Sequence, residues 1–131
     1  MNKLTVGMCA YDEREEDIAA ALNSAAKVAD SAIVVWARFA GYPQSLLAPP
    51  SLARLRTACT MPDVDLIVLT EQVLQSEARN TYMECAMLDG SPHVLVLDVD
   101  ERVLDDAVSQ ALPKDAPHAA VMISDRHLGR D

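Results

Sequence analysis

Two aspartates separated by one residue follow a run of strand-forming residues, HVLVL (93–97), and their side chains could bind a cation. In an extended segment alternate side chains point to the same side, so Asp98 and Asp100 can face one ligand together. Converging carboxylates raise each other's pKa unless a cation lies between them, and such hard oxygen ligands suit Mg²⁺ or Mn²⁺. The alternative is an acidic strand-to-helix turn in which one aspartate caps the next helix. The Asp-x-Asp pattern alone does not decide between the two.

Arg79 is the residue whose position suggests phosphate binding. It lies in SEARN (76–80), in the first turn of a predicted helix. There a guanidinium and backbone N–H groups can hold a phosphate together. The alternative is an exposed helical arginine, with Glu77 serving only as a first-turn acid.

The end of the first predicted strand, AYDE (10–13), is a third candidate for ligand contact. Asp12 is expected to cap the helix that follows, with Glu15 three residues on. Backbone groups at this turn can meet a nucleobase while Asp12 caps the helix.

Other common catalytic and binding patterns are absent from the sequence. There is no G-x-x-x-x-G-K-[ST] phosphate loop, no G-x-G-x-x-G, and no serine or cysteine nucleophile signature. The three histidines share no ligand spacing, and His93 is expected at the edge of the core. The three cysteines lack paired close spacing, which argues against zinc and disulfides and favours a reducing cytoplasm.

Length and charge narrow the class of protein further. A chain of 131 residues favours one domain, and its net charge of −9 argues against binding to nucleic acid or to an anionic membrane surface. No apolar run approaches the roughly 20 residues of a membrane span, and the start MNKLTVGMCAYDE reaches acidic residues too soon for a signal peptide. Any phosphate-bearing ligand must therefore be held locally, by a cation or an arginine.

The elements that position these residues follow from alternating apolar runs and helical patterns, typical of a parallel α/β sheet. Strands are predicted at 4–10, 32–37, 65–70, 93–98 and 118–124. Helices are predicted after Asp12, over 52–58 with Ser51 as cap, over 76–87 ending at Asp89-Gly90, and over 104–112. The segment 38–50 is expected to be a flexible loop.

The strands are continuously apolar, so the sheet should be covered on both faces, as in a three-layer α/β/α fold with a mostly parallel sheet. In such sheets ligands bind beyond the carboxyl ends of the strands, where the strand order reverses. The predicted site therefore lies among Ala10–Glu13, Ala37–Arg38 and Asp98–Arg102.

The order and spacing of these motifs resemble the family 2 glycosyltransferases with the GT-A fold, across about residues 3–130. In that family a strand ends near KNE, a D-x-G-S-x-D turn and an EARN helix follow, and a later strand ends in DADE. Here YDE (11–13) looks like the first motif, EARN (77–80) matches the third, and DVDE (98–101) matches the last but for one residue.

The resemblance implies a single GT-A-like domain, spanning 1–131, that binds a nucleotide-diphosphosugar. Backbone at Ala10 and Tyr11 would meet the base with Glu13 nearby, and Arg79 would lie near the phosphates. Asp98 would face the ribose or the metal, and Asp100 would coordinate Mg²⁺ or Mn²⁺ on the diphosphate, which would also stabilise the departing nucleoside diphosphate.

The chain departs from the family pattern in two places. After the second strand it reads WARFAGYP, so Ala37 and Arg38 stand where the acidic turn is expected, and Arg38 is a candidate phosphate ligand instead. Inverting members also carry a catalytic carboxylate in an acceptor-binding region beyond the DADE strand. The sequence ends before that region, and no candidate for a base is better than Asp125, His127 or Asp131, none of which matches a family motif.

Three hypotheses follow from the sequence. In the first, the chain is a minimal glycosyltransferase-like protein that binds a nucleotide sugar with a divalent metal and, if active, transfers a hexose to an unidentified acceptor, with a second copy or a partner chain completing the site. It is a catalytically silent GT-A-like binding module. Or it is an unrelated acidic α/β domain with a structural or regulatory role.

Overall fold

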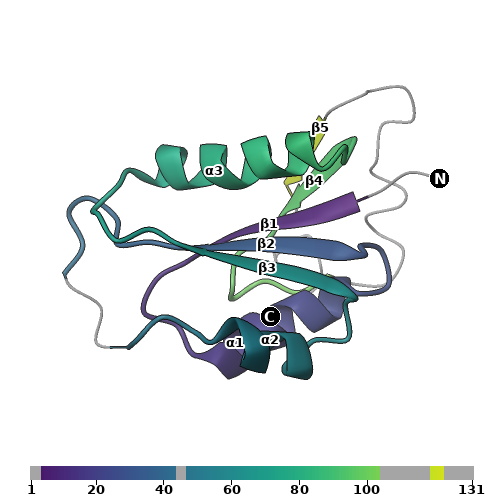
Figure 1. Ribbon diagram of the computed structural model, residues 1–131, viewed down its shortest axis with the longest axis horizontal. Helices are drawn as coiled ribbons and strands as arrows, with labels where there is room; N and C mark the ends of the chain where they lie inside the picture. The colour runs from purple at the N-terminus through teal and green to yellow at the C-terminus, as the bar shows by residue number, and fades with distance from the viewer. Residues whose placement is uncertain (1–3, 44–46, 104–118, 123–131) are drawn as a thin grey trace.

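The computed structural model describes residues 4–43, 47–103 and 119–122, and within them the chain alternates strands and helices (Figure 1). The elements are β1 (Leu4–Ala10), α1 (Glu15–Ala25), β2 (Ser31–Trp36), α2 (Leu52–Ala58), β3 (Asp63–Val68), α3 (Gln75–Leu88), β4 (His93–Val96) and β5 (Ala119–Met122). The predicted helix at 104–112 lies outside the described residues.

The strands form one sheet in the order β3-β2-β1-β4-β5, and every neighbouring pair is parallel. β1 is central: Val6 is in register with Ala32 of β2 on one side and with Leu95 of β4 on the other. The chain builds outward from β1 to β3 and then returns to place β4 on the opposite side of β1. The strand order therefore reverses between β1 and β4, which is where a ligand site is expected in such a sheet.

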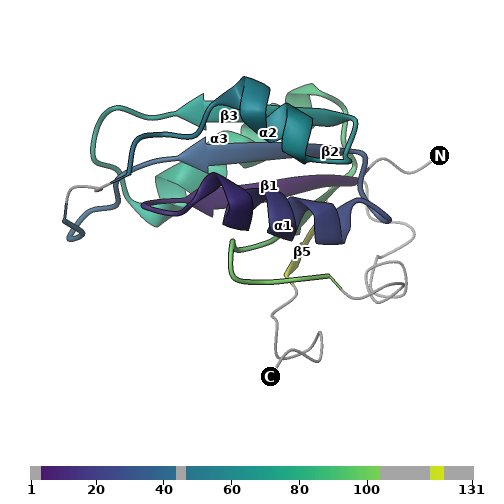
Figure 2. The ribbon, with the colours of Figure 1, turned by 90° about the horizontal axis from the view of Figure 1, so that it is seen from below.

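Helices cover both faces of the sheet, as the continuously apolar strands predict. α1 and α2 pack on one face and α3 on the other (Figures 1 and 2). Alternate residues of the central strands supply the two core layers: Val6, Met8 and Val34 pack toward α1 and α2. Val35 and Val94 pack toward α3. The predicted three-layer α/β/α class is confirmed.

Local sequence signals explain most element boundaries. The Ser51 hydroxyl accepts a hydrogen bond from Arg54 N (3.3 Å) and caps α2, as predicted. α3 ends at Leu88 with Asp89 as its C-cap, and Gly90 follows at φ +77°, a left-handed conformation that suits glycine after a helix.

The prediction that Asp12 caps α1 is wrong. The N-cap is Arg14, which has no side-chain cap, and Asp12 sits two residues earlier at φ +56°. Its carboxylate instead accepts a hydrogen bond from Leu47 N (2.9 Å), so it links the turn after β1 to the loop before α2. The acidic first turn of α1 (Glu15, Glu16 and Asp17) faces the positive end of the helix dipole without a cap.

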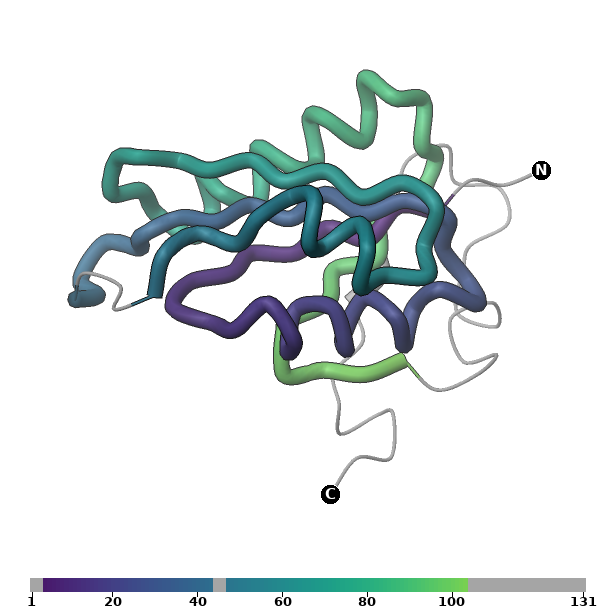
Figure 3. The backbone as a smooth tube through the Cα atoms, turned by 60° about the horizontal axis from the view of Figure 1, so that its bottom comes forward, coloured from purple at the N-terminus to yellow at the C-terminus, as the bar shows by residue number. Residues whose placement is uncertain are grey.

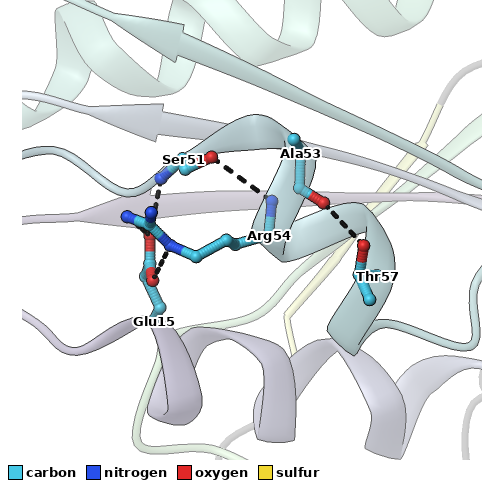
Figure 4. A network of polar contacts seen from close by, with 5 residues as sticks. All are labelled: Glu15, Ser51, Ala53, Arg54 and Thr57. Atoms are coloured by element: carbon cyan, nitrogen blue, oxygen red, sulfur yellow. Dashed lines mark hydrogen bonds and ion pairs between the residues drawn. The ribbon is translucent and has the colours of Figure 1, made fainter.

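Glu15 joins α1 to α2 (Figure 4). Its carboxylate accepts hydrogen bonds from Ser51 N (2.6 Å) and from Arg54 Nε and NH2 (2.9 and 3.0 Å). These bonds lower the pKa of Glu15, the Arg54 guanidinium having the largest effect. The Glu15 carboxylate therefore interacts favourably with the positive end of the α1 dipole and also positions the start of α2.

β3 is a terminal strand of the sheet among the described residues. The Arg56 Nε donates to the Val64 carbonyl (3.0 Å), and its NH2 pairs with Asp65 (3.1 Å). Asp63 and Asp65 are exposed on this strand. An α2 side chain thus occupies a backbone acceptor of the edge strand.

After β4 the chain continues past the sheet and alongside α1 (Figure 3). Leu97 N still donates to the Gly7 carbonyl (3.1 Å), and Val103 N reaches the Ser24 hydroxyl of α1 (2.9 Å). The 97–103 segment is therefore fixed at both ends.

None of the helices in the described residues is long and apolar enough to cross a membrane.

Candidate functional site

A polar cavity of about 420 Å³ lies at the carboxyl ends of the strands, where the strand order reverses between β1 and β4. It is lined by Cys9, Tyr11, Glu13, Phe39, Tyr42, Gln75, Arg79, Tyr82, Asp98, Val99 and Asp100. Five of the six site residues predicted from the sequence are among them: Tyr11, Glu13, Arg79, Asp98 and Asp100. The parallel topology thus brings together residues that are up to 89 positions apart in the chain.

Ala10 is the sixth predicted residue, and it does not line the cavity. Its side chain is fully buried at the end of β1. Its carbonyl accepts a hydrogen bond from Ala37 N (3.1 Å), which extends the pairing of β1 with β2 beyond Trp36. This carbonyl is therefore engaged, and the adjacent Tyr11 is the first residue after β1 that reaches the cavity.

Asp98 and Asp100 project from a closed turn. Glu101 accepts a hydrogen bond from Asp98 N through Oε1 (2.8 Å), and its own backbone N donates to the Asp98 carbonyl (3.0 Å). Asp98 and Asp100 are both exposed and both line the cavity, on either side of the buried Val99. Glu101 is therefore engaged in closing this turn, whereas Asp98 and Asp100 line the cavity.

The pKa of Asp98 is raised, because its carboxylate is partly desolvated and has another carboxylate nearby. Desolvation raises its pKa, the neighbouring charge of Asp100 raises it further, and the Arg79 guanidinium acts in the opposite direction. Such mutual repulsion between carboxylates is relieved by a bound cation.

Glu13 adds a third carboxylate to the cavity. Burial raises its pKa, and the charges of Asp100, Asp98 and Asp17 also raise it; the hydrogen bond from Tyr11 N to Glu13 Oε1 (3.0 Å) opposes the shift. Within the described residues no group of three or more His, Cys, Asp or Glu is arranged to enclose a metal ion. The donor set of Asp98 and Asp100 nevertheless fits Mg²⁺, which proteins often hold by one or two carboxylates plus substrate phosphates and water.

Arg79 is the one cationic side chain that lines this cavity in the described part of the chain. It is exposed, on the first turns of α3, whose N-terminus points toward the carboxyl edge of the sheet. Glu77, the neighbouring acid of the EARN motif, accepts a hydrogen bond from Leu74 N (3.0 Å) and so closes the start of the helix. Arg79 therefore faces the cavity together with the positive end of the α3 dipole.

Aromatic residues line another side of the cavity, and sequence reasoning did not identify them. The rings of Tyr11, Phe39 and Tyr42 lie 5.8–6.1 Å apart, with Tyr42 edge-on to both others. Cys9 and Tyr82 complete the floor; burial raises the pKa of the Cys9 thiol to about 11, so this thiol is protonated at neutral pH. The sequence signal that could have pointed to them is the scarcity of these residue types: the chain has one Phe and three Tyr, and all four line this cavity.

Arg38, the alternative phosphate ligand, is not among the residues that line the cavity. Its Nε donates to the Tyr42 carbonyl (3.2 Å), and Ala37 before it is buried. His93 is 2% exposed at the start of β4, which agrees with its predicted place at the edge of the core. The candidate bases Asp125, His127 and Asp131 lie outside the described residues.

A second cavity, of about 440 Å³, lies between α1 and α2. Its lining is largely apolar, and the polar groups at its rim, Glu15 and Arg54, are already bonded to each other. The cavity at the carboxyl edge therefore has the better chemistry for a polar ligand, although it is slightly smaller.

Comparison with known proteins adds no further constraint: no family model, no curated protein and no solved structure matches the chain. The functional interpretation accordingly depends on the cavity and on the motifs that line it.

Proposed function

We propose that the protein binds a nucleotide-diphosphosugar in the cavity at the carboxyl edge of the sheet, with Mg²⁺ or Mn²⁺, as a glycosyltransferase-like protein of the GT-A type. The observation that carries the proposal is the convergence of Arg79 with Asp98 and Asp100 on one cavity where the strand order reverses. These are the residues that the EARN and DVDE motifs supply, and they come from different elements.

The charges lining the cavity support a diphosphate held by two means. Arg79 and the N-terminus of α3 favour phosphate oxygens on one side. Asp98 and Asp100 would hold the cation on the other, and the closed Asp98–Glu101 turn fixes their spacing. A bound divalent cation would neutralise the charge of the diphosphate, including the charge that develops on the nucleoside diphosphate as it leaves. In a protein of net charge −9, such local cations are what an anionic ligand requires.

A second candidate function is a binding module without transferase activity. It is favoured by the state of Glu13, because the third carboxylate of the cavity is hydrogen-bonded to Tyr11 N and adjoins the two aspartates assigned to the cation. A transferase needs a general base that reaches the hydroxyl of the acceptor, and Glu13 is engaged within the cavity instead. If the protein is instead an active transferase, the proposed reaction is transfer of a hexose to an acceptor, with a second copy or a partner chain completing the site.

Thermal melting with UDP-, GDP- and dTDP-sugars, with and without Mn²⁺, tests the binding. A ligand at a hundredfold its Kd stabilises the protein by about 2.7 kcal/mol, which raises the Tm by a few degrees. We expect a shift that needs Mn²⁺ and that is lost in Asp100→Asn. Asp63→Asn is the matched control, because it removes the same charge from an exposed site at the start of β3, at the opposite edge of the sheet.

The absence of a shift with every donor would overturn the proposal. If donors bind, sugar released or transferred in the same samples, detected by NMR, separates the transferase from the silent binding module.

A further inference from the structure

The residues after β2 form a tight turn that presents two aromatic rings to the cavity. Tyr42 N donates to the Phe39 carbonyl (3.1 Å), and Gly41 between them has φ +88°, a conformation that side chains rarely adopt. The Arg38 Nε donates to the Tyr42 carbonyl and closes the turn from outside. The sequence RFAGY is therefore folded as a fixed support for Phe39 and Tyr42.

This turn is fastened to the start of α3. Phe39 forms an isolated parallel bridge with Val73, through Ala40 N to the Val73 carbonyl (2.8 Å) and Val73 N to the Arg38 carbonyl (2.9 Å). Figure 1 shows the loops after β2 and β3 side by side at the left, next to the first turn of α3. Because α3 also carries Arg79, these bonds fix the position of the aromatic turn relative to the Arg79 guanidinium, which is proposed to bind phosphate.

The rings form a wall with one exposed member. Phe39 is buried and packs at 5.9 Å from Tyr42 and 6.1 Å from Tyr11, whereas Tyr42 is 50% exposed. The Tyr11 hydroxyl is buried without a hydrogen-bond partner in the described residues. An exposed ring supported edge-on by two others offers a face to a flat ligand at little further ordering cost.

We propose that the wall of Tyr11, Phe39 and Tyr42 holds the nucleobase by stacking and that the site therefore accepts pyrimidine and guanine nucleotides alike. This inference rests on the proposed function, and it adds an aromatic surface for the base to the backbone contacts expected at the end of β1. Stacking on an aromatic ring is tolerant of base identity, because every base has a π-face. Ala37, directly after β2, is fully buried among the residues that support this wall, so it presents no group to the edge of a base.

The buried Tyr11 hydroxyl does not narrow this range. Uracil, thymine and guanine each carry acceptor atoms that a single phenol donor can satisfy. Strong discrimination arises when the wrong ligand leaves a buried polar group of the site unpaired, and none of these three bases does so to a single donor.

Calorimetric binding of pyrophosphate, UDP and GDP in the presence of Mn²⁺ tests the inference on wild type and on three variants. Tyr42→Ala removes the exposed ring, and Tyr42→Phe keeps it. Leu88→Ala is the control for loss of an exposed apolar side chain, because Leu88 is 87% exposed at the far end of α3.

We expect UDP and GDP to bind within about tenfold of each other, and both at least about tenfold more tightly than pyrophosphate. In Tyr42→Ala both nucleotides should weaken by about tenfold while pyrophosphate is unchanged. Tyr42→Phe and Leu88→Ala should match wild type. Circular dichroism confirms that each variant is folded.

Three results would overturn the inference while leaving the proposed function intact. The first two are nucleotides that bind no better than pyrophosphate and nucleotide binding unaffected by Tyr42→Ala. A preference of a hundredfold or more between UDP and GDP would also overturn it, since stacking alone does not discriminate so strongly. If pyrophosphate and both nucleotides fail to bind, the proposed function fails. Uridine and guanosine titrated against the tyrosine ring resonances then decide whether the aromatic wall still stacks a base.

Discussion

The ring of Tyr82 lies directly on the backbone of Gly7, so that a Cβ on Gly7 would overlap Cδ1 and Cε1 of the ring. Tyr82 is 1% exposed on α3, and it also lines the cavity at the carboxyl edge of the sheet. The absence of a side chain at one position of the central strand therefore sets both how closely α3 approaches the sheet and where the floor of the cavity lies.

Gly7→Ala is expected to destabilise the protein by about 1–3 kcal/mol, the usual range for an added methyl group in a packed core. Urea denaturation measures the change in the free energy of unfolding. In a Tyr82→Leu background the ring is absent, so the same substitution should be considerably less damaging. Equal losses in the two backgrounds would show that the contact does not limit packing.

Asp98→Asn is expected to raise the Tm at neutral pH in the absence of ligand. Partial desolvation of the carboxylate at the cavity and the charge of Asp100 raise the pKa of Asp98 above its ordinary value, so the folded state disfavours the ionised form. The stability associated with this group is fully present below its unfolded pKa of about 3.9 and is lost as pH rises through the higher folded pKa. The advantage of Asp98→Asn should therefore be present at pH 7 and vanish at low pH.

Melting curves across this pH range measure the effect, with Asp63→Asn as the control for loss of one negative charge. A variant less stable than wild type at pH 7 would contradict the view that Asp98 is retained at the expense of stability.

Thr5→Val is expected to destabilise the protein through a buried hydroxyl chain at the start of the sheet. Thr5 Oγ1 lies 2.7 Å from Ser31 Oγ and 2.5 Å from Ser91 Oγ, and all three residues are buried. Valine keeps the shape but leaves two hydroxyls without this partner, a loss of about 1–3 kcal/mol. Thr5→Ser retains the hydroxyl and should lose less. Chemical denaturation of the pair tests this order, and a valine variant as stable as the serine variant would refute it.

Glu15→Gln should weaken the junction of α1 and α2, with a pH dependence opposite to that of Asp98. The Arg54 and Ser51 bonds lower the pKa of Glu15, so its stabilisation is present above the unfolded pKa and is lost as pH falls through the lower folded pKa. The effect should be small and should shrink in high salt, because the pair is at the surface.

Glu16→Gln is the matched control, since it removes a first-turn charge without breaking the Glu15 contacts. Thermal melts at low and high salt compare the two variants. Identical losses would mean that only the helix dipole, and not the bond to Arg54, is involved.

The sequence was sufficient to predict the fold class and much of the candidate site. Apolar runs mark the strands, and the carboxyl ends of parallel strands meet at one edge of a sheet, so Glu13 and Asp98 had to be neighbours. Arg79 joins them because a helix between parallel strands starts at that same edge. These are consequences of topology, which hydrophobic patterning determines.

The remaining features depend on contacts that patterning does not encode. Asp12 looked like a helix cap by its place in the chain, but a left-handed backbone turns its carboxylate to Leu47. The position of Tyr42 depends on the turn at Gly41 and on the bridge between Phe39 and Val73, two segments that are distant in sequence. Arg38 was considered for phosphate because of its charge, and the same turn directs its Nε to a carbonyl.

The contact of Arg56 with β3 also bears on how the molecule behaves at high concentration. A terminal strand with free backbone groups is a template for a strand of another molecule, and such pairing leads to aggregation. Here the incoming strand would meet a carbonyl already taken by a guanidinium, flanked by the charges of Asp63 and Asp65. Among the described residues, this border of the sheet therefore carries two features that disfavour pairing with a strand of another molecule.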